Sequence, residues 1–318
     1  MKISVIGCGR WGSFIAWYLD SIHQDVTLYG RKESKHMQAF IETRKNNLLT
    51  LNDSVKLETS LDHLKEQDVI VISINSQGLQ SLFDELKPLE LKNKIFVLCM
   101  KGIEISTTRR LSEVAKDNLD STNKVAVWLG PGHVQEFIKG IPNCMVIDSE
   151  DKETTKLLVN EFSSDVIRFY YGNDMIGNEI GAAAKNVYGI AAGILDGYNL
   201  VTLKGALMSR GTREIARLIK AMGGNELSAY GLCHLGDYEA TVFSKFSHNR
   251  SFGEAFVKKE PFDCLAEGYY TTKALKYLGE KYHVELPINE TVYQMLYENL
   301  DAKTALDKLF KRSLKNEF

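Results

Sequence analysis

Apolar and polar positions follow two patterns along the first half of the chain. Short, nearly apolar runs rich in Val, Ile and Leu are separated by stretches in which apolar residues recur every three or four positions. The short runs predict buried strands and the longer stretches predict helices. The expected strands are 2–6, 25–30, 68–74, 94–102, 124–132, 143–148 and 166–171, with helices at 13–22, 77–86, 107–119 and 152–162. This alternation predicts a parallel sheet covered on both faces.

The pattern changes after about residue 172, where apolar runs lengthen and alternating strands are no longer found. Helices are expected at 177–197, 205–224, 269–284 and 287–300. The segment 228–256 lacks clean periodicity and is expected to form loops that carry function. At 318 residues the chain exceeds the usual size of one core. We therefore expect an α/β fold with two domains: a Rossmann-type, doubly wound parallel sheet at 1–172, and an all-helical domain at 173–318.

Composition narrows the class of protein. The formal net charge of −2 gives no basic surface that would indicate a nucleic-acid partner. Five scattered cysteines without CxxC spacing favour neither a disulfide framework nor a zinc site, and no histidine spacing of the HExxH kind suggests another metal. No apolar run reaches about 18 residues and no cleavable leader pattern is present. We expect a cytoplasmic protein without a membrane span.

A glycine turn joins the first expected strand to the first expected helix. Residues 7–12 read GCGRWG, which fits the dinucleotide-binding fingerprint in its required order of strand, turn and helix. Gly7 would make the tight turn, Gly9 would admit a pyrophosphate, and Gly12 would let the helix pack closely on the strand. The phosphates would lie at the helix N-terminus, where free N–H groups favour anions.

The second expected strand ends in Gly30-Arg31-Lys32, about 20 residues after the glycines, where NAD-specific folds offer an acidic residue to the ribose. A cationic pair there can accept a 2′-phosphate, so NADP is the favoured cofactor, with NAD as the alternative. The competing interpretation is a solvated basic loop, which explains Lys32 nearly as well but Arg31 less well.

The expected helix 177–197 has glycines on one face at four-residue spacing, with Lys185 in the middle of that face. Glycine inside a helix costs about 1 kcal/mol relative to alanine, so the run indicates that something approaches this backbone closely. Tight helix packing explains the glycines. It does not explain an ammonium among small residues, where desolvation would lower its pKa. We therefore favour a functional lysine, with the glycines giving substrate and cofactor domain access to it.

Several motifs together resemble those of the soluble NAD(P)-dependent glycerol-3-phosphate dehydrogenases, nearly end to end. They are GCGRWG at 7–12, LCMKGI at 98–103, LGPGHVQE at 129–136, AAAKNVYGIAAGILDG at 182–197, ALMSRG at 206–211, LGD at 235–237, NRSFGEAF at 249–256 and AEGYYT at 266–271. The resemblance implies hydride transfer between a nicotinamide and C2 of glycerol 3-phosphate, with dihydroxyacetone phosphate as the oxidised partner. It also implies a role in supplying the glycerol phosphate of membrane lipids.

The resemblance assigns roles to individual residues. Lys185 matches the family's catalytic acid/base, Asn186 its neighbour, and Lys101 the second lysine of the site. The implied substrate-binding residues are Lys101, Gly130, Gly132, Lys185, Asp237, Ser247, His248 and Asn249. The implied cofactor-binding residues are Gly7, Gly9, Arg10, Trp11, Gly12, Arg31, Lys101, Val134, His248 and Glu267. Lys185 would exchange the proton of the C2 oxygen, Lys101 would orient that oxygen and lower the Lys185 pKa, and Asp237 would hold Lys185 or a substrate hydroxyl.

Three positions depart from the family pattern. His248 stands where the family has arginine, Thr202 where it has asparagine, and Gly132 where it usually has Ser or Thr. Histidine cannot grip phosphate bidentately as arginine does. Either Arg250 or Lys204 compensates, which we favour, or the substrate is a relative of glycerol 3-phosphate.

Two other functions fit the same pattern. Dehydrogenases of the β-hydroxyacid and ketopantoate type share the two-domain plan and the lysine but act on carboxylates. A sensor that binds NAD(P) without chemistry would be expected to lack Lys185 or Lys101, and both are present. Besides a small-molecule substrate, the partner we consider is a second copy of the chain, in a homodimer.

Overall fold

The structure of this chain is a computed structural model that describes residues 1–244, 246–314 and 316–317. The chain forms two compact units. The first comprises Met1–Lys101 and Arg109–Glu179, and the second comprises Gly102–Thr108 and Ile180–Phe318.

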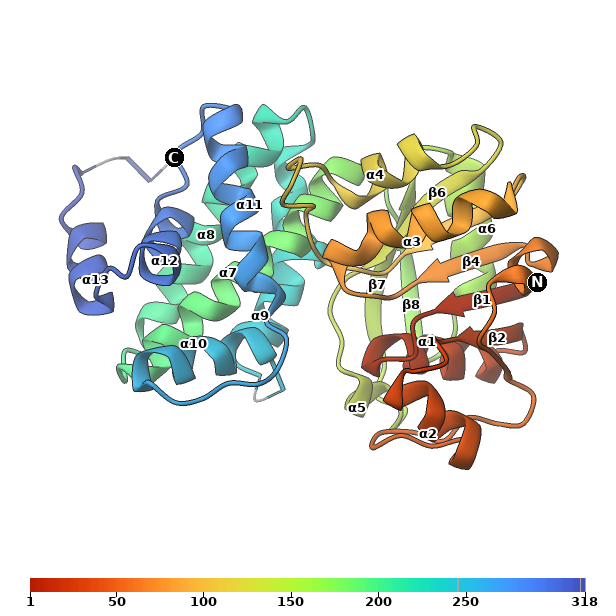
Figure 1. Cartoon of the computed structure of the whole chain (residues 1–318). Coiled ribbons are helices and arrows are strands. Elements are labelled where there is room, and N and C mark those ends of the chain that lie inside the picture. The colour runs from red at the N-terminus through yellow and green to blue at the C-terminus, as the bar shows by residue number, and fades with distance from the viewer. Residues whose placement is uncertain (245, 315, 318) are drawn as a thin grey trace. The chain divides into compact units, whose positions relative to one another are not determined.

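The first unit is an α/β structure in which strands and helices alternate (Figure 1). Its strands are β1 (Lys2–Ile6), β2 (Asp25–Tyr29), β3 (Lys56–Glu58), β4 (Val69–Ile72), β5 (Ile95–Leu98), β6 (Lys124–Leu129), β7 (Asn143–Ser149) and β8 (Ile167–Tyr171). Its helices are α1 (Arg10–Ser21), α2 (Lys35–Thr43), α3 (Leu79–Leu86), α4 (Leu111–Asn118), α5 (Val134–Phe137) and α6 (Lys152–Phe162). Neither α2 nor β3 was expected from the sequence, because neither has a long apolar pattern.

The eight strands form one sheet in the order β3-β2-β1-β4-β5-β6-β7-β8. The order reverses between β1 and β4, as in doubly wound folds, which confirms the expected fold class. One detail differs, because β7 runs antiparallel to β6, with Trp128 opposite Ile147, while all other pairs are parallel. The connection before β7 contains only the one-turn helix α5, whereas a parallel crossover usually uses a longer helix.

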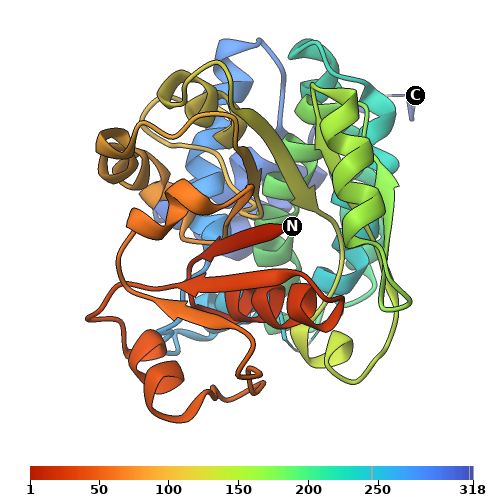
Figure 2. The same cartoon turned by 90° about the vertical axis from the view of Figure 1, so that its right-hand side faces the viewer.

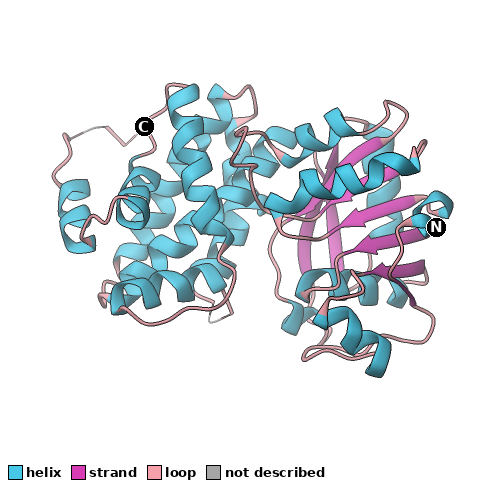
Figure 3. Ribbon diagram, viewed as in Figure 1, coloured by secondary structure: helices cyan, strands magenta, loops and turns pink. Residues whose placement is uncertain are grey.

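Helices cover both faces of this sheet (Figures 2 and 3). Helix α1 packs against β2 and α6 packs against β7 and β8, while α3 and α4 pack on each other. The core beside α1 is aromatic: the rings of Phe14 and Phe137 stack at 5.1 Å, and Trp128 meets Phe169 edge-on at 4.9 Å. This packing fixes the glycine turn that precedes α1.

From Ile180 on, the described elements of the second unit are all helices, whereas its segment Gly102–Thr108 contains none (Figures 1 and 3). Its helices are α7 (Met175–Gly197), which begins in the first unit, α8 (Leu203–Ala221), α9 (Asp237–Val242), α10 (His248–Lys258), α11 (Glu267–Lys281), α12 (Pro287–Tyr297) and α13 (Ala302–Phe310). The expectation of loops over 228–256 is wrong. Apart from Lys245, which lies outside the described residues, the segment contains α9, α10 and a π turn at Leu232–Gly236. These pieces are short and held by tertiary packing, so they show no sustained period.

Candidate active site

The glycine turn of the first unit has the geometry of a dinucleotide cradle. Gly7 has a φ of +113°, and a methyl group there would lie 2.2 Å from the Ser73 carbonyl oxygen. A methyl group on Gly12 would lie 1.9 Å from the Gly7 carbonyl oxygen, whereas one on Gly9 would meet no heavy atom within 4 Å. Helix α1 has no side-chain cap and no acidic residue in its first turn. The open space at Gly9 and the uncapped helix N-terminus therefore fit a pyrophosphate.

Replacing Gly12 with alanine is expected to weaken NADH and NADPH binding about tenfold or more and to lower the melting temperature, because the methyl group forces α1 away from the turn. Titration of the intrinsic fluorescence and thermal denaturation measure the two effects. Gly9→Ala should weaken binding with an unchanged melting temperature, since its methyl group fits the fold. Gly205→Ala, on α8, is the matched control, because a methyl group there also meets nothing within 4 Å. Wild-type binding by Gly12→Ala would contradict the cradle.

The other expected cofactor contacts near the turn differ in burial and in the partners of their side chains. Arg10 donates to the Gln135 side chain at 2.6 Å, and partial burial lowers the pKa of its guanidinium. The Trp11 indole packs against Phe137 with ring centroids 6.3 Å apart. Val134 is only 2% exposed and belongs to the aromatic core, so it can offer a nucleotide little beyond its backbone.

Arg31 follows β2, as expected, but it has a partner that the sequence did not suggest. Its guanidinium donates to the Glu85 carboxylate of α3 at 2.6 Å, and the two side chains are 64% and 39% exposed. Glu85 is 54 residues away in the chain, so no local pattern could have indicated this pair.

Lys101 and the glycines after β6 lie together at the carboxyl edge of the sheet, where ligands bind in open α/β folds. The Lys101 ammonium donates to the Gly130 carbonyl at 2.7 Å. Gly130 and Gly132 have φ values of +128° and +149°. A methyl group on Gly132 would lie 2.2 Å from the Phe137 ring, which explains why this chain has no Ser or Thr there.

Lys185 lies in the middle of α7 and is held by two side chains of α9. Its ammonium contacts the Asp237 carboxylate at 3.1 Å and the Thr241 hydroxyl at 2.8 Å. The side chains of Lys185 and Asp237 are 12% and 3% exposed. The expectation of an ammonium among apolar small residues is therefore corrected, since a carboxylate and a hydroxyl surround it. Thr241 was not singled out from the sequence, although it follows Asp237 by four residues and so shares its helix face.

The glycines of α7 serve helix packing within the second unit. A methyl group on Gly193 would lie 1.9 Å from the Arg250 carbonyl of α10, and one on Gly253 of α10 would lie 2.1 Å from the Ile190 carbonyl of α7. Gly181, Gly189 and Gly197 also face other segments of the same unit at under 3 Å. At Gly181, Gly189, Gly193 and Gly197 the interpretation that the glycines admit substrate is therefore wrong, and the packing alternative is correct for these four positions. At Gly181 the neighbour is the buried His234, whose pKa is lowered to about 4 by burial.

Asn186, Asn249 and the start of α11 form a second polar cluster in the same unit. The Asn249 amide donates to Asn186 at 3.0 Å, and its oxygen accepts from the Gly268 backbone N–H at 2.9 Å. Glu267 is the first residue of α11, and Ser247 caps α10 by accepting from Arg250 N–H at 3.3 Å. Asn249 thus joins α7, α10 and α11 close to Lys185.

His248 is an exposed residue in the first turn of α10. The two cations suggested to compensate for its missing charge have other partners. Lys204 contacts Asp196 at 2.6 Å and is 5% exposed, and Arg250 contacts the same carboxylate at 3.1 Å. Arg250 also contacts the Glu254 carboxylate at 3.0 Å. Two carboxylates therefore already pair with these two cations, which disfavours compensation by either one.

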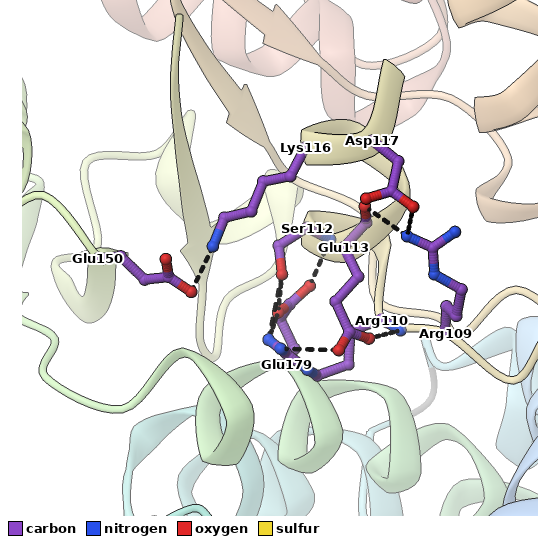
Figure 4. A network of polar contacts seen from close by, with 8 residues as sticks. All are labelled: Arg109, Arg110, Ser112, Glu113, Lys116, Asp117, Glu150 and Glu179. Carbon is purple, nitrogen blue, oxygen red and sulfur yellow. Dashed lines mark hydrogen bonds and ion pairs between the residues drawn. The ribbon is translucent and has the colours of Figure 1, made fainter. Parts of the chain in front are cut away.

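The start of α7 is anchored by a buried ion pair in the first unit (Figure 4). Glu179 accepts from the Arg110 guanidinium at 2.6 Å, the Ser112 hydroxyl at 2.6 Å and the Ser112 backbone N–H at 2.9 Å. The side chains of Arg110 and Glu179 are only 9% and 6% exposed. Because Ser112 lies in the first turn of α4, Glu179 ties the beginning of α7 to the beginning of α4. Neither residue belonged to a sequence motif, so this anchor was not expected.

A dinucleotide cradle on a doubly wound sheet, followed by a helical unit with a buried lysine–aspartate pair, defines a two-domain NAD(P)-dependent dehydrogenase. The chain matches the models described as NAD-dependent glycerol-3-phosphate dehydrogenase N-terminus, over residues 2–155, and C-terminus, over residues 174–307. It belongs to this family and is an oxidoreductase that uses NAD(P).

Individual relatives agree with this assignment. A glycerol-3-phosphate dehydrogenase (NAD(P)+) from Fusobacterium nucleatum is 36% identical, with 100% of this chain and 98% of the relative covered. The crystal structure of glycerol-3-phosphate dehydrogenase from Coxiella burnetii has a TM-score of 0.91 at 29% identity and covers 98% of this chain and 99% of that one. A ketopantoate reductase from Ralstonia eutropha has a TM-score of 0.63 at 14% identity and covers 98% of this chain and 100% of that one. It therefore shares the fold alone.

The described residues lack two features, a membrane-spanning helix and a cluster of metal ligands. Within residues 1–244, 246–314 and 316–317, no helix is long and apolar enough to span a bilayer. The same part of the chain holds no group of three or more His, Cys, Asp or Glu placed to bind a metal ion.

Proposed function

We propose that the chain catalyses the reversible reduction of dihydroxyacetone phosphate to sn-glycerol 3-phosphate with NADH or NADPH. The observation that carries this proposal is the buried Lys185 ammonium held by Asp237 and Thr241. An ammonium fixed by a carboxylate and a hydroxyl suits proton exchange with an alkoxide oxygen. Full-length relatives with this activity in their names support the choice of substrate.

In the proposed reaction, Lys185 gives its proton to the C2 oxygen of the ketone during reduction and takes it back during oxidation. Asp237 keeps the ammonium in place through the 3.1 Å contact. A nicotinamide cofactor, when bound, would supply or accept the hydride. Lys101 contributes a second ammonium for the substrate oxygen or phosphate, with Gly130 and Gly132 beside it. Ser247, His248 and Asn249, at the start of α10, are proposed to complete the substrate site.

The nucleotide is proposed to bind the first unit. Gly7, Gly9 and Gly12 would receive the pyrophosphate, with Arg10 and Trp11 beside it. Val134, Arg31, Lys101, His248 and Glu267 are the remaining proposed cofactor contacts. We accordingly assign nucleotide binding to residues 1–172 and substrate binding to residues 173–318. We also propose that the enzyme acts in the cytoplasm, as a homodimer, and supplies glycerophospholipid synthesis.

A spectrophotometric assay tests the proposal. NADH and NADPH oxidation is followed with dihydroxyacetone phosphate, with ketopantoate and with small 2-keto acids, at equal concentrations. We expect a kcat/KM for dihydroxyacetone phosphate that exceeds those for the carboxylates by about 10³-fold or more, because a site built for one polar group rejects substrates that leave its groups unpaired. Faster turnover of a carboxylate would favour a dehydrogenase of the ketopantoate type. Nucleotide binding without turnover of any substrate would favour a sensor.

A further inference from the structure

The surface after β2, where the adenosine ribose binds in dinucleotide folds, carries charges of both signs. Arg31 and Lys32 supply two cations, and Glu33 and Glu85 supply two carboxylates. Arg31 is bonded to Glu85 at 2.6 Å. Glu85 also raises the pKa of the Tyr29 phenol, after the larger effect of burial, and Arg31 opposes it. The charges of Glu85 and Arg31 therefore both affect the pKa of Tyr29, the last residue of β2.

Glu85 supplies the carboxylate that is missing from the end of β2. In NAD-specific folds an acidic residue there accepts a hydrogen bond from the ribose 2′-hydroxyl, whereas in NADP-specific folds arginine accommodates the 2′-phosphate. Here the arginine is present but a carboxylate from α3 already contacts it. A 2′-phosphate would have to displace Glu85 or lie beside it, and both alternatives cost free energy because like charges repel.

We propose that Glu85 determines the nucleotide preference of this enzyme and makes NADH the better ligand than NADPH. The inference rests on the proposed nucleotide site. It reverses the preference for NADP that Arg31 and Lys32 suggested in the sequence, because it takes account of the charge that faces them. Without the Glu85 charge, Arg31 would lose this carboxylate partner and be available to a phosphate.

Equilibrium binding tests the proposal without any substrate. The dissociation constants of NADH and NADPH are measured by fluorescence titration for the wild-type enzyme and for Glu85→Gln. The wild type should bind NADH more tightly. Glu85→Gln should shift the ratio of the two constants toward NADPH by about fivefold or more. One exposed pair of charges interacts weakly, but the 2′-phosphate carries close to two negative charges, which enlarges its repulsion by Glu85. The shift should shrink at high salt, because screening weakens the repulsion.

Two further variants control for indirect effects. Glu153→Gln removes one exposed carboxylate from α6 and has the same net charge as Glu85→Gln, so it should leave the ratio unchanged. Arg31→Met combined with Glu85→Gln should abolish the gain in NADPH binding, because the released cation is gone. A Glu85→Gln shift no larger than that of Glu153→Gln overturns the inference, as does a wild type that binds neither nucleotide. Normal binding shifts without turnover of dihydroxyacetone phosphate would contradict the proposed substrate and leave this inference supported.

Discussion

Lys185→Met should lower kcat for dihydroxyacetone phosphate reduction by about 10³-fold or more and leave the dissociation constants of NADH and NADPH nearly unchanged. Methionine keeps much of the side chain's length but removes the proton that the C2 oxygen needs. The proposed cradle around Gly9 lies in the first unit, whereas Lys185 belongs to the second. Steady-state kinetics and nucleotide titration on the same preparation measure both quantities.

Loss of the ammonium leaves Asp237 buried without its cation, so Lys185→Met also carries a stability cost. Lys185→Met with Asp237→Asn removes that uncompensated charge and should recover thermal stability without recovering turnover. Lys204→Met is a matched control, because Lys204 also forms a buried contact with an aspartate, Asp196, in the same unit. It should lower the melting temperature but keep most of kcat. Comparable kcat losses in Lys204→Met and Lys185→Met would show that the effect is structural.

The strands could be predicted because the sheet is buried on both faces, which makes each strand a nearly continuous apolar run. The antiparallel entry of β7 could not be predicted, since apolar runs contain no information on strand direction. The strand Lys56–Glu58 is three residues long, polar and at the sheet edge, so it leaves no pattern. Short helices such as α9 are stabilised by packing against the rest of their unit. A helix of so few residues is too short to show a recognisable apolar period in the sequence.

Motifs located the candidate site better than they described its surroundings. The glycine turn at 7–12 could be interpreted from spacing alone, because the positive φ of Gly7 and the close approach of Gly12 to the Gly7 carbonyl are local. The contact of Gly7 with the distant Ser73 could not be predicted in this way. The partners of Lys185 and Arg31 are distant in the chain, at Asp237 and Glu85. A sequence gives the charge of each of these residues but does not show which of them are in contact in the folded chain. The face of glycines on α7 was misinterpreted for the same reason, since a close neighbour was expected but could not be identified as α10, α9 and His234.

Arg110→Met should lower the free energy of unfolding by about 3–5 kcal/mol, because it leaves the Glu179 carboxylate buried without its cation. Burial already raises the pKa of Glu179, and Arg110 opposes that rise. Its folded-state pKa therefore exceeds the unfolded one, and should rise further in the variant. The stability this group contributes is present at low pH and is lost as pH rises through the folded-state pKa. The loss of unfolding free energy in Arg110→Met relative to the wild type should accordingly be smaller at pH 5 than at pH 8. Urea unfolding at the two pH values measures it.

The exposed ion pair of Lys116 and Glu150, also drawn in Figure 4, provides the control for this prediction. Lys116→Met should cost less than about 1 kcal/mol, because water solvates the carboxylate that remains. Arg110→Met with Glu179→Met should be less destabilised than Arg110→Met alone, since no unpaired charge stays buried. If Arg110→Met costs no more than Lys116→Met, the pair does not anchor α7. If Arg110→Met lowers the free energy of unfolding more than Lys116→Met does, the ion pair of Arg110 and Glu179 holds the start of the helix that carries Lys185.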